Sequence, residues 1–201
     1  AQIIGPSVQQ MMKWIGEIIM LSTDSNPLIM GVVIAVIVGM VLTLPISSAA
    51  LCLMLELDGL AAGAATIGCC AQMIGFATIS FRDNGVKGIL AQGLGTSMLQ
   101  VPNIYKNWKI WIPPTLASAI IGPIAIIYFN MENSALESGM GSCGLVGQIG
   151  TFNAMKSKYD STYILTSILI LQIIAPAVIS YIIYYFMRKK NWIKDGDMKL
   201  G

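Results

Sequence analysis

The sequence predicts an all-α fold: a polytopic bundle of membrane-spanning helices with a re-entrant hairpin and an amphipathic helix at the membrane interface. Only 11% of the 201 residues are charged, whereas a typical soluble domain carries roughly 25%. Four stretches hold almost no charge, and as helices of about 20 residues each could cross the ~30 Å hydrocarbon layer. A fifth stretch is rich in glycine. The predicted membrane domain covers residues 23–187, with spans at 27–46, 60–80, 110–131 and 161–187.

The first 22 residues predict the amphipathic helix. Gln10, Lys13 and Glu17 occupy the face opposite an apolar stripe, which is typical of a helix lying along a membrane surface. A helix packed on other protein is the alternative. The stripe is formed by Ile4, Val8, Met11, Ile15 and Ile18.

The distribution of basic residues predicts the orientation. Basic residues gather between the second and third spans and again in the tail, residues 188–201, so both regions are expected in the cytoplasm. Both termini are then expected in the cytoplasm. Lys156 and Lys158 would lie outside, against the rule. Residues 84–100 predict a second amphipathic helix, although the glycines in this stretch have low helix propensity.

The composition also excludes several functions. The net charge is only +2 and the basic residues are scattered, which argues against nucleic acid as a partner. There is no histidine, so histidine-dependent catalysis, histidine–metal sites and histidine phosphorylation are excluded within these residues. The four cysteines show no CxxC spacing and are interpreted as small buried apolar residues. We therefore expect no metal, no cofactor and no catalytic residue.

The stretch from Asn130 to Met155 is the most informative, because glycines recur in it every two or three residues. It is too long and apolar for a simple turn, yet too rich in glycine for a regular spanning helix. We interpret residues 132–156 as a re-entrant segment, whose backbone at membrane depth must be satisfied by protein, water or a ligand. An extracellular loop with solvated polar residues is the alternative.

Carboxylates and amides in this stretch suit the hydroxyl groups of a sugar or polyol, since each can hydrogen-bond to a hydroxyl. The candidate binding residues here are Asn133, Glu137, Gln148 and Asn153. A second acidic pair, Glu56 and Asp58, lies between the first two spans. Acids at mid-bilayer are costly and usually functional, whereas acids in the interface need no special role, so both readings stay open for this pair.

Three stretches together resemble the membrane (IIC) components of phosphotransferase-system sugar transporters, and more narrowly the perfringolysin O regulator-like (PfoR-like) branch. They are NPLIMGVVIAVIVGMVLTLPISSAA, GCCAQMIGFATISFRDNGVKGILAQGLGTSMLQVPNI and MGSCGLVGQIGTFNAM. The resemblance implies a sugar path between a transport and a scaffold domain, an elevator-like motion, a homodimer and soluble IIA and IIB phosphoryl-carrier partners. It covers residues 20 to 188 and corresponds to the C-terminal half of a longer protein, which the start at Ala1 and the four spans also lead us to expect.

The sequence departs from the family pattern in two ways, and the first is that the family's usual histidine is missing. The second is that the family's sugar-binding glutamate–proline motif is absent, since the corresponding residues are Gly141 to Leu145, with Gln148 as the nearest polar residue. The re-entrant glycine-rich segment and its amides favour, as the first hypothesis, a sugar-translocating IIC-type subunit. A membrane sensor or regulator with a vestigial transport fold, and a secondary transporter of another small polar solute, are the alternatives.

Overall fold

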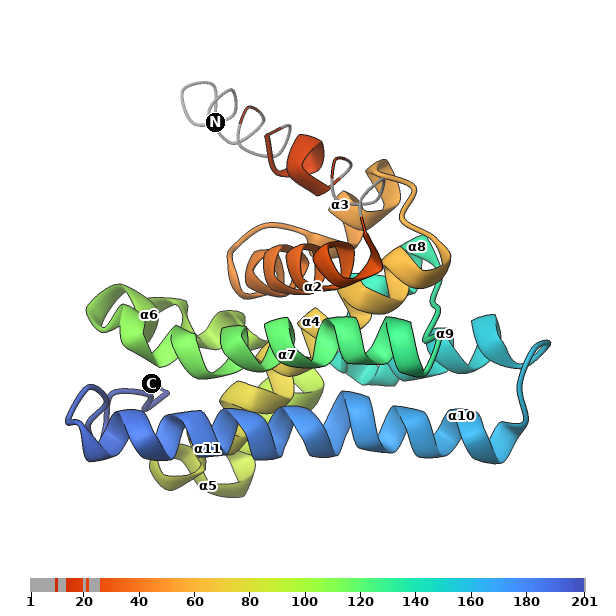
Figure 1. Cartoon of the computed structure of the whole chain (residues 1–201). Helices are drawn as coiled ribbons and strands as arrows, with labels where there is room; N and C mark the ends of the chain where they lie inside the picture. Colours follow the sequence, from red (N-terminus) through yellow and green to blue (C-terminus); the bar gives the residue numbers. More distant parts are fainter. Residues whose placement is uncertain (1–9, 11–13, 20, 22–25, 201) are drawn as a thin grey trace.

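The computed structural model describes residues 10, 14–19, 21 and 26–200 (Figure 1). The described residues form helices and no strand, which confirms the all-α prediction. The amphipathic helix predicted for residues 1–22 lies largely outside them. The elements, in which η marks a 3-10 or π turn, are α2 (Pro27–Thr43), α3 (Ser48–Met54), α4 (Gly59–Ile79), α5 (Phe81–Leu90), η1 (Ala91–Gly95), η2 (Ser97–Gln100), α6 (Val101–Lys106), η3 (Trp108–Trp111), α7 (Ile112–Tyr128), α8 (Ala135–Ser138), η4 (Cys143–Leu145), α9 (Val146–Met155), α10 (Ser161–Ile168), η5 (Leu169–Ile174) and α11 (Ala175–Lys189).

The buried helix α4 lies at the centre, and α2, α7 and α11 pack against it. Small residues allow this close packing, as they commonly do between helices in lipid. A Cβ atom added to Gly39 of α2 would lie 2.6 Å from the carbonyl oxygen of Gly68 in α4. The backbones of α2 and α4 are therefore nearly in contact, and no larger residue fits at this crossing.

Three helical stretches of the described residues are long and apolar enough to cross a membrane: Gly59–Ile79, Trp108–Tyr128 and Ser161–Lys189. The shorter apolar helix α2 has 17 residues. Helix α7 contains Pro123 in its interior. The last stretch is one long run in which α10 passes through the π turn η5 into α11 (Figure 1).

Residues 84–100 do not form one amphipathic helix. Helix α5 is kinked at Gly85, whose φ is +58°, and ends at Leu90. A π turn, η1, and a 3-10 turn, η2, follow before α6 begins. The break has a physical reason: Gln92 lies inside the protein, where its Nε2 donates to Ser80 Oγ at 2.7 Å and its Oε1 accepts from Gln100 at 2.8 Å. These tertiary bonds stabilise a chain path that a regular helix does not follow.

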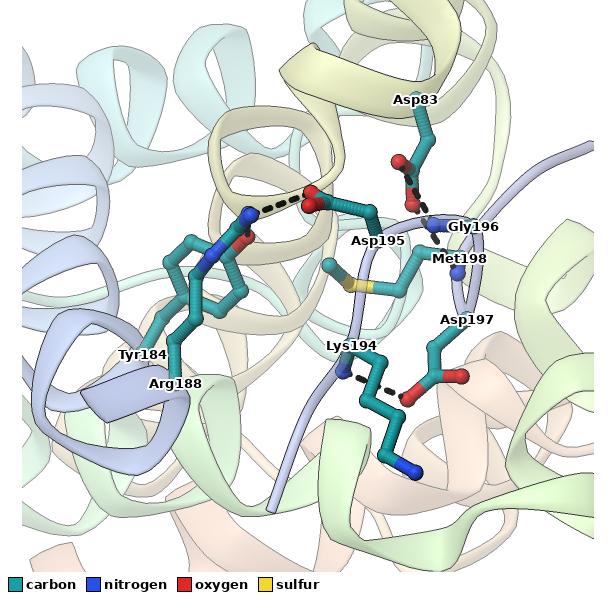
Figure 2. Close-up of polar contacts among 8 residues, drawn as sticks. All are labelled: Asp83, Tyr184, Arg188, Lys194, Asp195, Gly196, Asp197 and Met198. Carbon is teal, nitrogen blue, oxygen red and sulfur yellow. Dashed lines mark hydrogen bonds and ion pairs between the residues drawn. The ribbon is translucent and has the colours of Figure 1, made fainter. Parts of the chain in front are cut away.

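The C-terminal tail, residues 190–200, folds back against α5 and α6. The carboxylate of Asp83 accepts from the backbone amides of Gly196 at 3.0 Å and Met198 at 3.1 Å (Figure 2). Asn84 bonds to Met198 O and to the amide of Leu200, both at 2.8 Å. Met198 is buried, so the tail is packed as well as hydrogen-bonded.

Candidate substrate site

The segment from Glu132 to Lys158 leaves one end of α4 and comes back to that same end. At its start, the backbone amide of Asn133 donates to Gly59 O at 3.2 Å, beside the first residue of α4. At its far end, Lys158 Nζ lies 2.6 Å from a carboxylate oxygen of Glu132. We call residues 132–158 the glycine segment. Its two ends are thus held together, with α8, η4 and α9 between them.

The middle of the glycine segment reaches the midpoint of α4. Gly141 has φ of +54°, and a Cβ added to it would lie 2.7 Å from Cys69 Cβ. Only glycine adopts this conformation readily and also leaves room for the α4 backbone. The recurring glycine therefore lets the segment pack directly on the central helix.

A second irregular segment reaches the same depth from the other end of α4. Ser142 Oγ donates to the carbonyl oxygen of Gly93 at 2.6 Å, and Gly93 belongs to the π turn η1. Residues 81–106, which we call the amide segment, therefore touch the glycine segment near the midpoint of α4. Two breaks in regular helix meet at one place inside the bundle.

Next to this meeting point lies a buried polar cluster around Gln148. This side chain is 8% exposed, and its Nε2 donates to Cys70 Sγ at 3.4 Å. Its Oε1 has no hydrogen-bond partner among the described residues. A buried amide oxygen without a donor costs about 1–3 kcal/mol, so this atom is a candidate acceptor for a ligand.

Gln172 completes the cluster from the last helix. Its Nε2 donates to Thr151 Oγ1 at 2.9 Å and approaches Met131 Sδ at 3.4 Å. Gln172 lies in the π turn η5, and π turns in helices are frequent at functional sites. Gln172, Cys70 and Thr151 were not among the predicted binding residues. The available signal was that Gln172 is the one carboxamide in the apolar stretch 161–187.

Asn133 is buried, but all its polar atoms are used. Its Nδ2 donates to Thr66 Oγ1 at 2.7 Å and to Gly147 O at 3.1 Å, and its Oδ1 accepts from the amide of Ser134 at 2.8 Å. Asn133 therefore ties the two arms of the glycine segment to α4. Glu137 lies nearby in α8, half-buried, and accepts from the hydroxyl of Ser134.

The remaining predicted residues lie away from the cluster. Asn153 is exposed on α9 and accepts from Lys156 Nζ at 3.3 Å. Glu56 and Asp58 are exposed in the turn between α3 and α4. The structure thus brings Asn133, Glu137 and Gln148 close together. Asn153, Glu56 and Asp58 lie apart from them.

The polar groups that contact Gln148 and Gln172 are neutral: they are amides, hydroxyls, thiols and a thioether. The carboxylate of Glu137 lies nearby and is bonded to Ser134, and the described residues contain no group of metal-ligating side chains. The nearest ion pair of the glycine segment is the exposed one between Lys158 and Glu132, and the hydrogen bond to Glu132 raises the pKa of Lys158 above its usual value of 10.5. Such a neutral site favours an uncharged hydroxylated ligand.

Buried glutamines elsewhere are saturated. Gln72 Oε1 accepts from Trp111 Nε1 at 3.0 Å and Gln72 Nε2 donates to Thr115 Oγ1 at 3.1 Å. This glutamine joins α4 to α7 and leaves nothing for a ligand. Among the buried glutamines of the described residues, Gln148 therefore differs in having a side-chain oxygen without a hydrogen-bond partner.

Comparison with known proteins identifies the family. A family model described as "Phosphotransferase system, EIIC" matches residues 1–200. The comparisons found no similar curated protein and no similar solved structure. Membership in this family implies a sugar substrate and soluble IIA and IIB partners. Because the match covers almost the whole chain and three helices can span a membrane, the chain belongs to the EIIC family and is a membrane transport subunit of a bacterial phosphotransferase system.

Proposed function

We propose that this EIIC chain translocates a neutral sugar or polyol and binds it at Gln148 and Gln172. The observation that carries the proposal is the buried Gln148 Oε1 without a hydrogen-bond donor. A sugar hydroxyl donates a hydrogen bond to this oxygen. The same or a neighbouring hydroxyl accepts from the Nε2 of Gln172, in competition with Thr151.

The proposal includes a re-entrant path for the glycine segment. Its ends meet at the Glu132–Lys158 pair and its middle packs against Cys69, halfway along α4. A segment of this kind presents backbone groups and side chains at membrane depth beside protein instead of lipid. Asn133 and Glu137 then hold the arms of the segment in place, and Glu56, Asp58 and Asn153 lie at its solvent-facing rim.

Access to the site requires a movement. Ser142 of the glycine segment and Gly93 of the amide segment are hydrogen-bonded directly beside the cluster. We infer that these two segments separate when the substrate enters or leaves, which agrees with an elevator-like or gating motion. The one hydrogen bond that closes them is weak enough, about 1 kcal/mol net, to break during transport.

The wider assignment follows from the family. We propose a homodimer with cytoplasmic termini, in which the IIA and IIB partners phosphorylate the sugar on the cytoplasmic side. The chain itself has no histidine to carry a phosphoryl group. Placement in the PfoR-like branch is part of the same proposal.

The test is equilibrium binding of a panel of hexoses, pentoses and hexitols to the purified full chain in detergent. We expect one class of neutral sugar or polyol to bind. Gln148→Leu removes the acceptor and should weaken binding by about tenfold to a hundredfold.

Asn153→Ala is the matched control, because Asn153 is an amide of the same segment that lies exposed. It should bind as the wild type does. Equal affinity in wild type and Gln148→Leu, with both proteins folded by circular dichroism, would contradict the proposed site. Failure of every sugar and polyol to bind would contradict the proposed substrate class.

A further inference from the structure

A cavity lies at the opposite end of the molecule from the glycine segment's ends, beside the last turns of α11. Its volume is about 240 Å³. It is formed by α11 together with the first turn of α5, and its lining is entirely basic or aromatic. The lining residues are Arg82, Tyr181, Tyr184, Tyr185, Arg188 and Lys189.

The cavity holds three cations and one of them is neutralised. Arg188 pairs with Asp195 of the tail, and its Nη1 donates to Tyr184 Oη at 2.8 Å (Figure 2). Arg82 and Lys189 make no ion pair among the described residues. The neighbouring carboxylate of Asp83 is occupied by the amides of Gly196 and Met198. The cavity therefore keeps a net positive charge that a ligand can balance.

The position along α11 places this charge at a membrane surface. The apolar stretch Ser161–Lys189 has 29 residues. At 1.5 Å per residue it spans about 44 Å, which matches a bilayer including both headgroup layers. Its basic end thus lies at headgroup depth, and the three tyrosines there are typical of the aromatic belt at that depth.

The face of α11 next to the cavity is apolar and uncovered among the described residues. Tyr181, Ile182, Tyr185 and Phe186 are exposed, Phe186 by 61%. A ligand that balances the charge can therefore extend acyl chains along the helix. Free phosphate would use the cations but would leave this face bare.

We propose that this cavity binds the phosphate group of an anionic phospholipid. The phosphate oxygens accept from Arg82 and Lys189 and from the tyrosine hydroxyls, and the acyl chains lie along the exposed face of α11. A zwitterionic lipid binds less well, because its ammonium group adds positive charge beside the same cations. Arg188 stays paired with Asp195 and Tyr184 and forms part of the cavity wall.

The test titrates the purified, delipidated full chain with short-chain phosphatidylglycerol, with short-chain phosphatidylcholine and with inorganic phosphate, and counts bound molecules by native mass spectrometry. We expect one saturable phosphatidylglycerol site with at least tenfold preference over phosphatidylcholine. Arg82→Gln with Lys189→Gln should weaken that site by roughly thirtyfold.

Two control variants keep the result interpretable. Lys87→Gln with Lys106→Gln removes the same charge from exposed residues that do not line the cavity, and it should leave the affinity unchanged. Arg82→Lys with Lys189→Arg keeps the charge and should retain binding. Equal binding of the two lipids, or an unchanged affinity in the folded Arg82→Gln, Lys189→Gln variant, overturns the proposal. If inorganic phosphate binds as tightly as phosphatidylglycerol, the cavity recognises free phosphate and the proposed lipid ligand is wrong.

Discussion

The glycine segment and the amide segment approach the midpoint of α4 from opposite ends, yet they are held in different ways. The amide segment is fixed by a chain of side-chain amides: Gln92 bonds to Gln100, and Gln100 bonds to Met198 O of the tail at 3.0 Å. The glycine segment is fixed mainly by direct backbone packing on α4, at Gly141 and Cys69.

The difference concerns which polar atoms remain available. In the amide segment Gln92 and Gln100 bond to each other and to neighbouring groups, so this region is saturated and serves as scaffold. In the glycine segment the buried Gln148 Oε1 is left without a donor. Saturated buried amides help to specify a fold, whereas the unsaturated oxygen of Gln148 is the observation on which the proposed ligand site rests.

The largest expected effect tests the packing of the glycine segment. Gly141→Ala forces an alanine into a left-handed conformation, at about 1–2 kcal/mol, and brings its Cβ against Cys69, at about 1–3 kcal/mol more. We expect the free energy of unfolding in detergent, from denaturant titration, to fall by roughly 2–5 kcal/mol.

Gly144→Ala separates the two contributions. Gly144 has φ of +53°, but an added Cβ would meet only Val146 Cγ2 at 4.0 Å. The Gly144→Ala variant should therefore lose only the free energy of unfolding that comes from the left-handed conformation, about 1–2 kcal/mol. Equal losses in the two variants would mean that the tip of the segment does not pack on α4.

The second effect tests the saturated region. Asp83→Ala removes two hydrogen bonds from tail amides to a carboxylate. The half-buried position reduces their worth to roughly 2 kcal/mol in total. The tail should then open more often, and trypsin should cleave after Lys190 and Lys194 about thirtyfold faster, as measured by mass spectrometry of the released peptide.

Asp160→Ala is the control for this effect, because Asp160 caps α10 at 3.0 Å from the amide of Thr162 and does not touch the tail. It should leave the cleavage rate as in the wild type. Sugar binding should be equal in both variants if the two segments are held independently. If trypsin cleaves the Asp83→Ala protein as slowly as the wild type, the carboxylate of Asp83 does not hold the tail in place.

The smallest effect comes from the exposed ends of the glycine segment. Lys158→Gln removes an ion pair whose lysine side chain is 54% exposed, so the melting temperature should fall by about 2 °C or less. In the wild type the contribution is complete below pH 10.5 and is lost as the pH rises through the raised pKa of Lys158. Scanning fluorimetry at low and high salt should show the difference shrinking with screening.

The spanning helices could be predicted because long apolar stretches have few alternatives in lipid. The breaks in them could not. The π turns η1 and η5 hold Gln92 and Gln172, and both residues bond to side chains outside these turns, Gln92 to Ser80 and Gln172 to Thr151. Local sequence does not contain that information. The docking of the tail through Asp83 depends in the same way on tertiary contact.

The candidate site was partly predictable for a similar reason. Gln148 was among the predicted residues because its amide, like the other amides and carboxylates of this stretch, can hydrogen-bond to a sugar hydroxyl. Nothing in the sequence distinguished it from Asn153, five residues later, because burial is decided by which face of α9 meets α4. Gln172 was missed because its partner Thr151 belongs to another element.

The π turn η5 changes which way the final helix faces. One row of its buried positions recurs every four residues, at Ile164, Ile168, Gln172, Pro176, Ser180 and Tyr184, and the buried Ser167, Leu171 and Met187 lie outside this row. In a regular helix of 3.6 residues per turn, such a row would wind about 200° around the axis between its first and last members. The single wide turn takes back about half of that rotation. One face can therefore follow the bundle from end to end.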